Sequence, residues 1–180
     1  MIKNYIWDFD GTLYNSYPHI TEAFLAALGR FGIVCDRGEA FAALSISIDY
    51  ACEKYGVTSE QKELFRELNN DCDFTPLIVP FEGAAEILER VIKSGGVNYI
   101  FTHRRADSLE YYLKKYGLDG FFRECVTADN GFENKPSPEG VLYLAEKYSL
   151  NKGETVMIGD REIDVLSGIN AGTKACLIAG

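Results

Sequence analysis

Short apolar segments alternate with longer amphipathic segments along most of the chain. The apolar segments have the length and the polar flanks of buried strands, which predicts strands at residues 5–9, 97–102, 124–128, 155–160 and 174–179. The amphipathic segments repeat apolar side chains three or four positions apart, which predicts helices at residues 82–94, 106–116 and 138–148. Alternation of this kind is typical of an α/β domain with a parallel sheet.

Residues 15–79 interrupt this alternation. Their pattern predicts helices alone, at residues 18–31, 38–55 and 59–71, with turn signals near Gly32, Gly56 and Thr75-Pro76. The interval is far longer than an ordinary connection between a strand and the next element. We therefore predict a core formed by residues 1–14 and 80–180, with a small helical cap at residues 15–79 inserted after the first strand.

The composition of the 180 residues is ordinary for a globular protein, with 47% hydrophobic and 25% charged residues. The formal net charge of −9 argues against a general nucleic-acid surface and against an anionic membrane as partner. No apolar stretch has the length of a signal peptide or a membrane span, so we expect a cytoplasmic protein, as a monomer or weak dimer. The five cysteines include no C-x-x-C pair, which indicates free thiols: Cys35, Cys52, Cys72, Cys125 and Cys176.

Four polar loops at or after the predicted strands carry the side chains of chemical interest. In an open parallel sheet, the carboxyl ends of the strands meet at the edge where ligands bind. The loops are DFDGT (8–12), THRR (102–105), NKPSPEG (134–140) and GDREID (159–164).

The aspartates of these loops predict a metal site. Asp8 and Asp10 are two positions apart in a predicted strand end, so both carboxylates are expected on one side. Adjacent carboxylates are destabilising unless a cation neutralises them or one carries a proton. Asp160 and Asp164 follow another strand at helical spacing. Few hard oxygen ligands, with room for substrate oxygens, suit Mg²⁺.

The remaining loops carry groups that suit a phosphate. Thr102 offers a hydroxyl and Lys135 an ammonium group, and backbone amides are available at both loops. Together with a metal and a carboxylate, these groups provide the charge neutralisation and positioning that phosphoryl transfer requires. One carboxylate could attack phosphorus, and a neighbouring carboxylate could move the proton.

The sequence resembles the haloacid dehalogenase-like (HAD) superfamily of phosphohydrolases over essentially the whole chain. The resemblance rests on DFDGT (8–12), FTHR (101–104), KPSPEG (135–140) and IGDREID (158–164), in the order of the family. It implies a Rossmann-like three-layer core. The stretch LYNSYPHITEAF (13–24) resembles the branch of phosphoglycolate phosphatases and β-phosphoglucomutases, which has a helical cap here. The sequence departs from the pattern of this branch at two places. Asn15 stands where these relatives usually have Asp, and the sequence ends at KACLIAG, where many relatives continue with a further strand and helix. The second departure indicates either a short member of the branch or a missing tail.

The resemblance implies a role for each aspartate. Asp8 is expected to be the nucleophile and a magnesium ligand. Asp10 is expected to be the general acid and base, and its backbone carbonyl a second ligand. Asp160 is the expected third ligand, with Asp164 as a partner of the metal through water.

The resemblance also implies which residues contact the substrate. Thr102 and Lys135 are the expected phosphate anchors, together with the backbone amides of Phe9 and His103. Two further side chains are candidates for substrate contact, namely His19 and Arg104.

The leading hypothesis is a magnesium-dependent phosphatase that hydrolyses a small phosphorylated metabolite through a phospho-aspartate. One alternative is a phosphosugar mutase of the β-phosphoglucomutase type, which uses the same core but protects the acyl phosphate from water. Another is a non-catalytic binding or regulatory protein that keeps the fold. Dehalogenase chemistry is disfavoured by Asp10, Lys135 and Asp160, and phosphonatase chemistry would need a cap lysine, for which Lys54 is the candidate.

Overall fold

The computed structural model describes residues 1–71 and 76–178, and these form two compact units. The first unit combines Met1–Tyr14 with the chain from Pro80 onward, and the second is Asn15–Val79. Three residues of the sequence-based predictions lie outside the described residues: Cys72, Thr75 and Ala179, the last residue of the strand predicted at 174–179.

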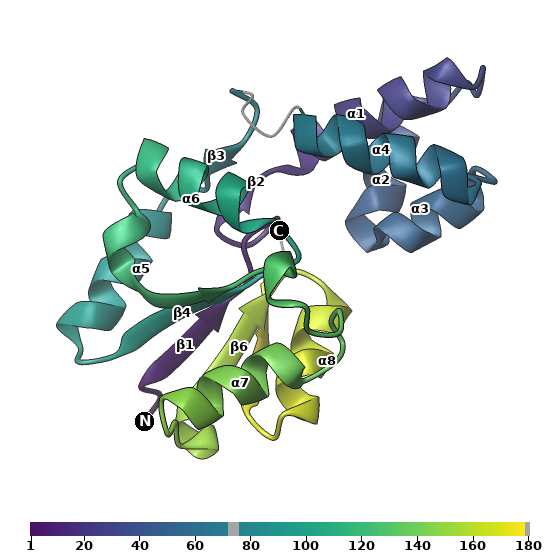
Figure 1. Ribbon diagram of the computed structural model, residues 1–180. Helices are drawn as coiled ribbons and strands as arrows, with labels where there is room; N and C mark the ends of the chain where they lie inside the picture. Colours follow the sequence, from purple (N-terminus) through teal and green to yellow (C-terminus); the bar gives the residue numbers. More distant parts are fainter. Residues whose placement is uncertain (72–75, 179–180) are drawn as a thin grey trace. The chain divides into compact units, whose positions relative to one another are not determined.

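A parallel five-stranded sheet forms the centre of the first unit, in the order β5-β4-β1-β6-β7 (Figure 1). The strands are β1 (Asn4–Trp7), β4 (Val97–Phe101), β5 (Phe122–Val126), β6 (Thr155–Gly159) and β7 (Lys174–Leu177). β5 starts and ends two residues earlier than the strand predicted at residues 124–128. It ends at Val126 because the next residue, Thr127, caps the short 3₁₀ helix η2 (Ala128–Asn130).

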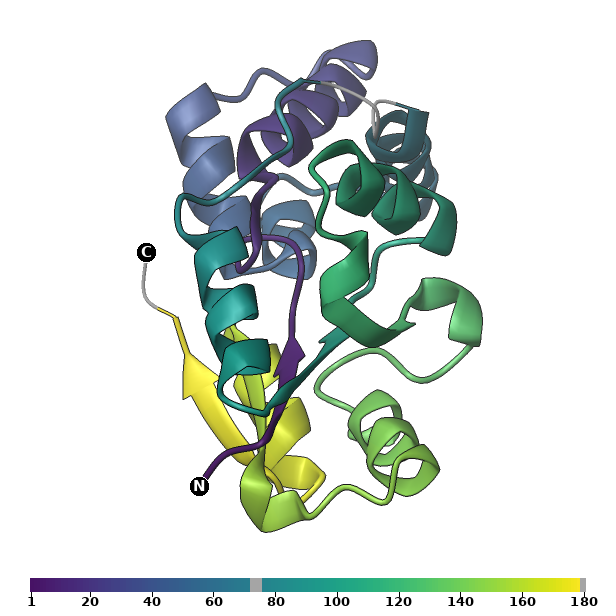
Figure 2. The same ribbon diagram turned by 90° about the vertical axis from the view of Figure 1, so that its left-hand side faces the viewer.

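Helices cover both faces of this sheet. They are α5 (Ala84–Lys93), α6 (Ala106–Lys115), α7 (Glu139–Lys147) and α8 (Glu162–Asn170), and two 3₁₀ turns connect them to strands, η1 (Asp119–Phe121) and η3 (Lys152–Glu154). Figures 1 and 2 show α5 and α6 on one face and α7 and α8 on the other. The predicted Rossmann-like three-layer α/β class is thus confirmed.

Side chains alternate between the two faces of the sheet. On the face of α7, Ile6, Tyr99 and Met157 pack with Val141 and Leu144 in one buried cluster.

The opposite face of the sheet buries a polar contact. Asn98 accepts a hydrogen bond from the Trp7 indole N–H at 2.9 Å and donates to the Leu88 carbonyl of α5 at 3.1 Å. The buried amide is therefore satisfied by partners from β1 and α5.

The strand order places the carboxyl end of β1 between two neighbours. From β1 the chain forms β4 and β5 on one side, and it then returns to form β6 and β7 on the other. Trp7 is in register with Ile100 of β4 and with Ile158 of β6, and the Asp8 N–H donates to the Ile158 carbonyl at 2.8 Å. The loops that follow β1, β4 and β6 therefore meet at the position where open α/β sheets bind ligands.

Four helices form the described part of the second unit: α1 (Tyr17–Arg30), α2 (Arg37–Ile46), α3 (Ile48–Lys54) and α4 (Ser59–Asp71). The prediction of a single helix at residues 38–55 is wrong, because Ser47 separates α2 from α3. The backbone of Ser47 is extended, with φ −168° and ψ 159°, and its hydroxyl accepts from the Tyr50 N–H at 2.9 Å. A serine that caps a new helix in this way competes with continuation of the preceding one.

Short segments connect the two units. β2 (Tyr14–Asn15) pairs with β3 (Val79–Pro80) in a two-stranded sheet. Strands of two residues are too short to leave a pattern in the sequence, and neither was predicted. No helix in residues 1–71 and 76–178 is both long and apolar enough to cross a membrane.

Candidate active site

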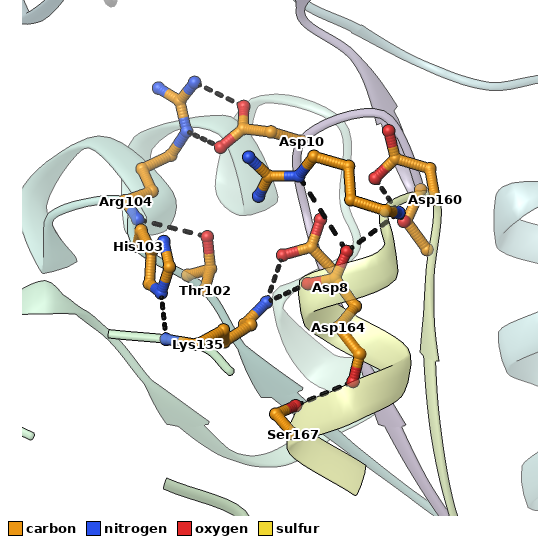
Figure 3. Close-up of polar contacts among 11 residues, drawn as sticks. Asp8, Asp10, Thr102, His103, Arg104, Lys135, Asp160, Asp164 and Ser167 are labelled. Atoms are coloured by element: carbon orange, nitrogen blue, oxygen red, sulfur yellow. Dashed lines mark hydrogen bonds and ion pairs between the residues drawn. The ribbon is translucent and has the colours of Figure 1, made fainter. Parts of the chain in front are cut away.

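The two aspartates that follow β1 diverge. β1 ends at Trp7, and the next residues turn, because the Phe9 carbonyl accepts from the amide N–H of Leu13 and Tyr14 and Gly11 adopts φ +81°. Figure 3 shows the Asp8 carboxylate directed toward Lys135, while the carboxylate of Asp10 faces Arg104. Because β1 ends at Trp7, strand alternation does not orient these two side chains, and each carboxylate has its own charged partner.

A buried lysine lies between two buried carboxylates. Lys135 Nζ lies 2.6 Å from Asp8 Oδ1 and 2.7 Å from Asp164 Oδ1, and none of these three side chains is more than 1% exposed. Burial raises the pKa of Asp8 to about 7; the negative charges of Asp164 and Asp10 act in the same direction, and the positive charges of Lys135 and Arg161 oppose it. One ammonium group thus faces two carboxylates, and this centre favours a further positive charge.

Three carboxylates converge beside this lysine. Asp8, Asp160 and Asp164 each offer one oxygen, and these oxygens lie within 4.8 Å of one another. Asp8 Oδ2 is buried and has no hydrogen-bond partner among the described residues. Asp160 accepts a 3.4 Å hydrogen bond from the Thr12 hydroxyl. An unpartnered buried carboxylate oxygen among hard oxygen donors fits Mg²⁺.

Gly159 allows Asp164 to reach this centre. A Cβ atom at position 159 would lie 2.2 Å from the Cβ of Asp164, so any larger residue would displace the carboxylate. Asp164 lies in the first turn of α8, where its Oδ2 accepts from the Arg161 N–H at 3.1 Å. Helix geometry and the glycine together place this side chain opposite Lys135.

The loop after β4 supports the lysine from the other side. The Lys135 backbone N–H donates to His103 Nε2 at 2.9 Å, so this ring nitrogen is an acceptor. Burial lowers the pKa of His103 to about 4, and the charges of Lys135 and Arg161 add to this effect. Thr102 is buried beside it, and its hydroxyl accepts from the Arg104 N–H at 3.1 Å. His103 is thus a neutral support of the lysine loop.

The sequence profile of the haloacid dehalogenase-like hydrolases matches residues 5–178, which is nearly the whole chain. The chain belongs to this family. The resemblance stated from the sequence motifs is therefore confirmed.

Individual relatives agree with this assignment. The chain is 28% identical over 184 residues to the pyrophosphatase PpaX of Halalkalibacterium halodurans, covering 98% of this chain and 83% of the relative. It is 33% identical to a hydrolase of known structure from Streptococcus pneumoniae TIGR4, with a TM-score of 0.71 and coverage of 99% and 94%. The fold also matches the crystal structure of a predicted phosphoglycolate phosphatase from Haemophilus somnus, with a TM-score of 0.79 at 21% identity, covering 97% of this chain and 84% of the other.

Within this haloacid dehalogenase-like hydrolase, two candidate substrate contacts are less accessible than the sequence suggested. His19 is 1% exposed inside the second unit, where its Nε2 lies 3.1 Å from the Asn69 carbonyl oxygen. Arg104, the other candidate for substrate contact, is 7% exposed and pairs with Asp10. Sequence reasoning missed this ion pair, because its partners are separated by 94 positions. The sequence did contain a signal for this pair, since the two residues have opposite charges and lie in loops that were predicted at the same edge of the sheet.

The neutral state of His103 predicts a pH-dependent stability. In the unfolded chain His103 has its ordinary pKa of 6.5, whereas in the folded protein the pKa of His103 is about 4. The unfolded state therefore binds more protons between these values, and stability falls as the pH is lowered through this window. We expect His103→Gln, which keeps an acceptor for the Lys135 N–H, to lose less stability between about pH 7 and about pH 5.

Urea denaturation at the two pH values measures this difference. The remaining acidic groups titrate in both proteins, so the parent chain is the matched reference for the variant. An equal loss of unfolding free energy in both would show that His103 is not held neutral.

Proposed function

We propose that this hydrolase is a magnesium-dependent phosphatase that hydrolyses a small phosphorylated metabolite through a phospho-aspartate on Asp8. The observation that carries the proposal is the buried Asp8 carboxylate, with one oxygen on Lys135 and the other without a hydrogen-bond partner among the described residues. A carboxylate stripped of water and oriented by a fixed ammonium group is suited to nucleophilic attack.

The first half-reaction transfers the phosphoryl group to the protein. An Asp8 oxygen attacks phosphorus, and the bond between phosphorus and the leaving oxygen breaks. Asp10 donates a proton to that oxygen, which departs as an alcohol or an acid. Lys135 remains beside Asp8, and Thr102 with the amides of Phe9 and His103 would hold the phosphoryl oxygens.

The second half-reaction regenerates the enzyme. Asp10, now ionised, accepts a proton from water as the water oxygen attacks the phosphorus of the acyl phosphate. The bond between phosphorus and Asp8 breaks, inorganic phosphate leaves, and Asp8 is again a carboxylate. The buried setting of Asp8 limits access of further water to the intermediate.

The carboxylates would hold the magnesium ion. Asp8, Asp160 and the backbone carbonyl of Asp10 are the proposed ligands, with Asp164 as a support through water. When bound, the ion supplies charge neutralisation for the phosphoryl oxygens. The convergence of Asp8, Asp160 and Asp164 oxygens supports this assignment.

We propose that the Asn15–Val79 unit, which contains His19, is a cap that would contact the leaving group of the substrate. We also propose that the substrates are cytoplasmic metabolites. The relatives named pyrophosphatase and predicted phosphoglycolate phosphatase suggest two compounds for a first test, pyrophosphate and phosphoglycolate.

A phosphatase panel tests the proposal. The purified chain is incubated with pyrophosphate, phosphoglycolate, sugar phosphates and p-nitrophenyl phosphate, with Mg²⁺ or with excess chelator. We expect phosphate release that requires Mg²⁺, since removal of the ion leaves the acidic centre without its counter-charge. Absence of release from every compound with Mg²⁺ present would contradict the proposed function.

A further inference from the structure

The carboxylate of Asp10 is held at two points by one guanidinium group. Arg104 Nη2 lies 2.6 Å from Asp10 Oδ1, and Arg104 Nε lies 3.4 Å from Asp10 Oδ2 (Figure 3). A planar fork that meets both oxygens restrains the plane of a carboxylate as well as its position. A lysine would supply the same charge without this restraint.

The guanidinium is itself fixed by its surroundings. Its Nη1 donates to the Ser108 hydroxyl at 2.7 Å, and its Cζ lies 5.2 Å from the Phe9 ring centroid and 5.6 Å from that of Tyr112. Ser108 and Tyr112 lie one turn apart in α6, so one face of this helix supports the arginine. The hydroxyl and the two aromatic rings therefore restrict the motion of the guanidinium group, so that it can hold the Asp10 carboxylate in one position.

The backbone of Arg104 is anchored as well. Its N–H donates to the Thr102 hydroxyl at 3.1 Å, and its carbonyl accepts from the Ala128 N–H at 3.0 Å. Arg104 therefore joins Asp10 to the loops after β4 and β5. These bonds connect a residue of the first loop to the rigid edge of the sheet.

Exposure separates the roles of the two partners. The Arg104 side chain is 4% exposed, whereas that of Asp10 is 21% exposed. A substrate oxygen or a water can therefore approach the carboxylate while the guanidinium stays covered.

We propose that Arg104 is a positioning residue, which holds the Asp10 carboxylate at the place where it exchanges a proton with the leaving oxygen and with water. The inference rests on the proposed phosphatase function. Asp10 lies in a turn beyond the end of β1, so its own backbone element does not fix its side chain. Proton transfer requires hydrogen-bond distance, and a displacement of about 1 Å can cost about 10²-fold in rate.

The test compares Arg104→Met with Arg105→Met. Arg105 is the adjacent arginine, but its side chain is 56% exposed and pairs only weakly with Asp107 at 3.5 Å. With an alkyl phosphate and Mg²⁺, we expect Arg104→Met to lower kcat by about 10²-fold, and KM and the inhibition constant of inorganic phosphate to change by no more than about twofold. Arg105→Met should match the parent in both constants.

A second substrate distinguishes loss of proton transfer from general damage. An alkyl phosphate has a poor leaving group that needs protonation, whereas p-nitrophenolate leaves without it. We expect kcat/KM of Arg104→Met to fall more for the alkyl phosphate, as it should for Asp10→Asn. Equal losses for both substrates would overturn the positioning role.

A double-mutant cycle completes the test. If Arg104 acts through Asp10, then Arg104→Met in an Asp10→Asn background should change kcat by no more than about twofold. A full loss in that background would overturn the proposal, as would parent-like activity of Arg104→Met in the wild-type background. If Arg104→Met fails to fold, Arg104→Lys replaces it in the test. We expect Arg104→Lys to keep the KM of the parent and to lose less kcat than is expected for Arg104→Met.

The two proposals fail in different ways. An inactive parent protein would remove the proposed function, and the positioning role with it. An active parent with an unaffected Arg104→Met variant would remove the positioning role alone. Thermal melting of each variant verifies that the compared proteins are folded.

Discussion

Asp8→Asn is expected to reduce phosphate release by at least about 10⁴-fold, as removal of a nucleophile does in other covalent mechanisms. Asparagine has the shape of aspartate but cannot form the acyl phosphate. The fold should be retained, because the carboxylate is buried and its raised pKa shows that its charge is costly there. Lys135 keeps its second partner, Asp164, at 2.7 Å.

Phosphate release and acid-quenched labelling measure this effect. The parent protein should carry phosphate on an acid-stable, base-labile acyl group during turnover, and Asp8→Asn should carry none. Asp119→Asn is the matched control, since Asp119 is exposed in η1, which precedes β5. Full activity of Asp8→Asn would contradict the role of Asp8 and the proposed mechanism.

Lys135→Met is expected to affect both stability and activity. It leaves Asp8 and Asp164 buried without their shared ammonium group, and loss of one partner of a buried ion pair costs about 3–5 kcal/mol. Activity should fall as well, because the attacking carboxylate loses the group that orients it. Urea denaturation with chelator present measures the stability without a contribution from bound metal.

Two comparisons identify the cause of the loss. Lys93→Met is the control, since Lys93 is 68% exposed and pairs with Glu89 at the surface of α5, where ion pairs contribute little. The double variant Lys135→Met/Asp164→Asn should regain part of the lost stability, because it removes one of the unpaired charges. Parent-like stability of Lys135→Met would show that the three buried groups do not depend on one another.

Local patterns predicted the fold well where periodicity is strong. The five strands of the first unit are short apolar runs and its helices α5, α6 and α7 are amphipathic, so local spacing predicted them, whereas α8 was not among the predicted helices. Ser47 shows the limit of this reasoning, since the helical pattern continues through 38–55. Only the extended backbone and the cap on Tyr50 N–H divide it into two helices.

The candidate site was predictable at the level of loops, and less so at the level of side chains. Asp8, Lys135 and Asp160 were identified because charged and polar residues follow strands whose carboxyl ends share an edge. The divergence of Asp10 from Asp8 was not visible, since it depends on a turn that begins at the end of β1.

The sequence by itself determined the family, the α/β class and the four loops that carry the polar groups, because these follow from local spacing and from motif order. Only the tertiary structure decided which charges meet. The bond from Lys135 to Asp8 spans 127 positions and that from Arg104 to Asp10 spans 94. Such pairs form when packing of the sheet and helices brings distant loops together and removes their charges from water, so that each charge must find a partner in the folded chain.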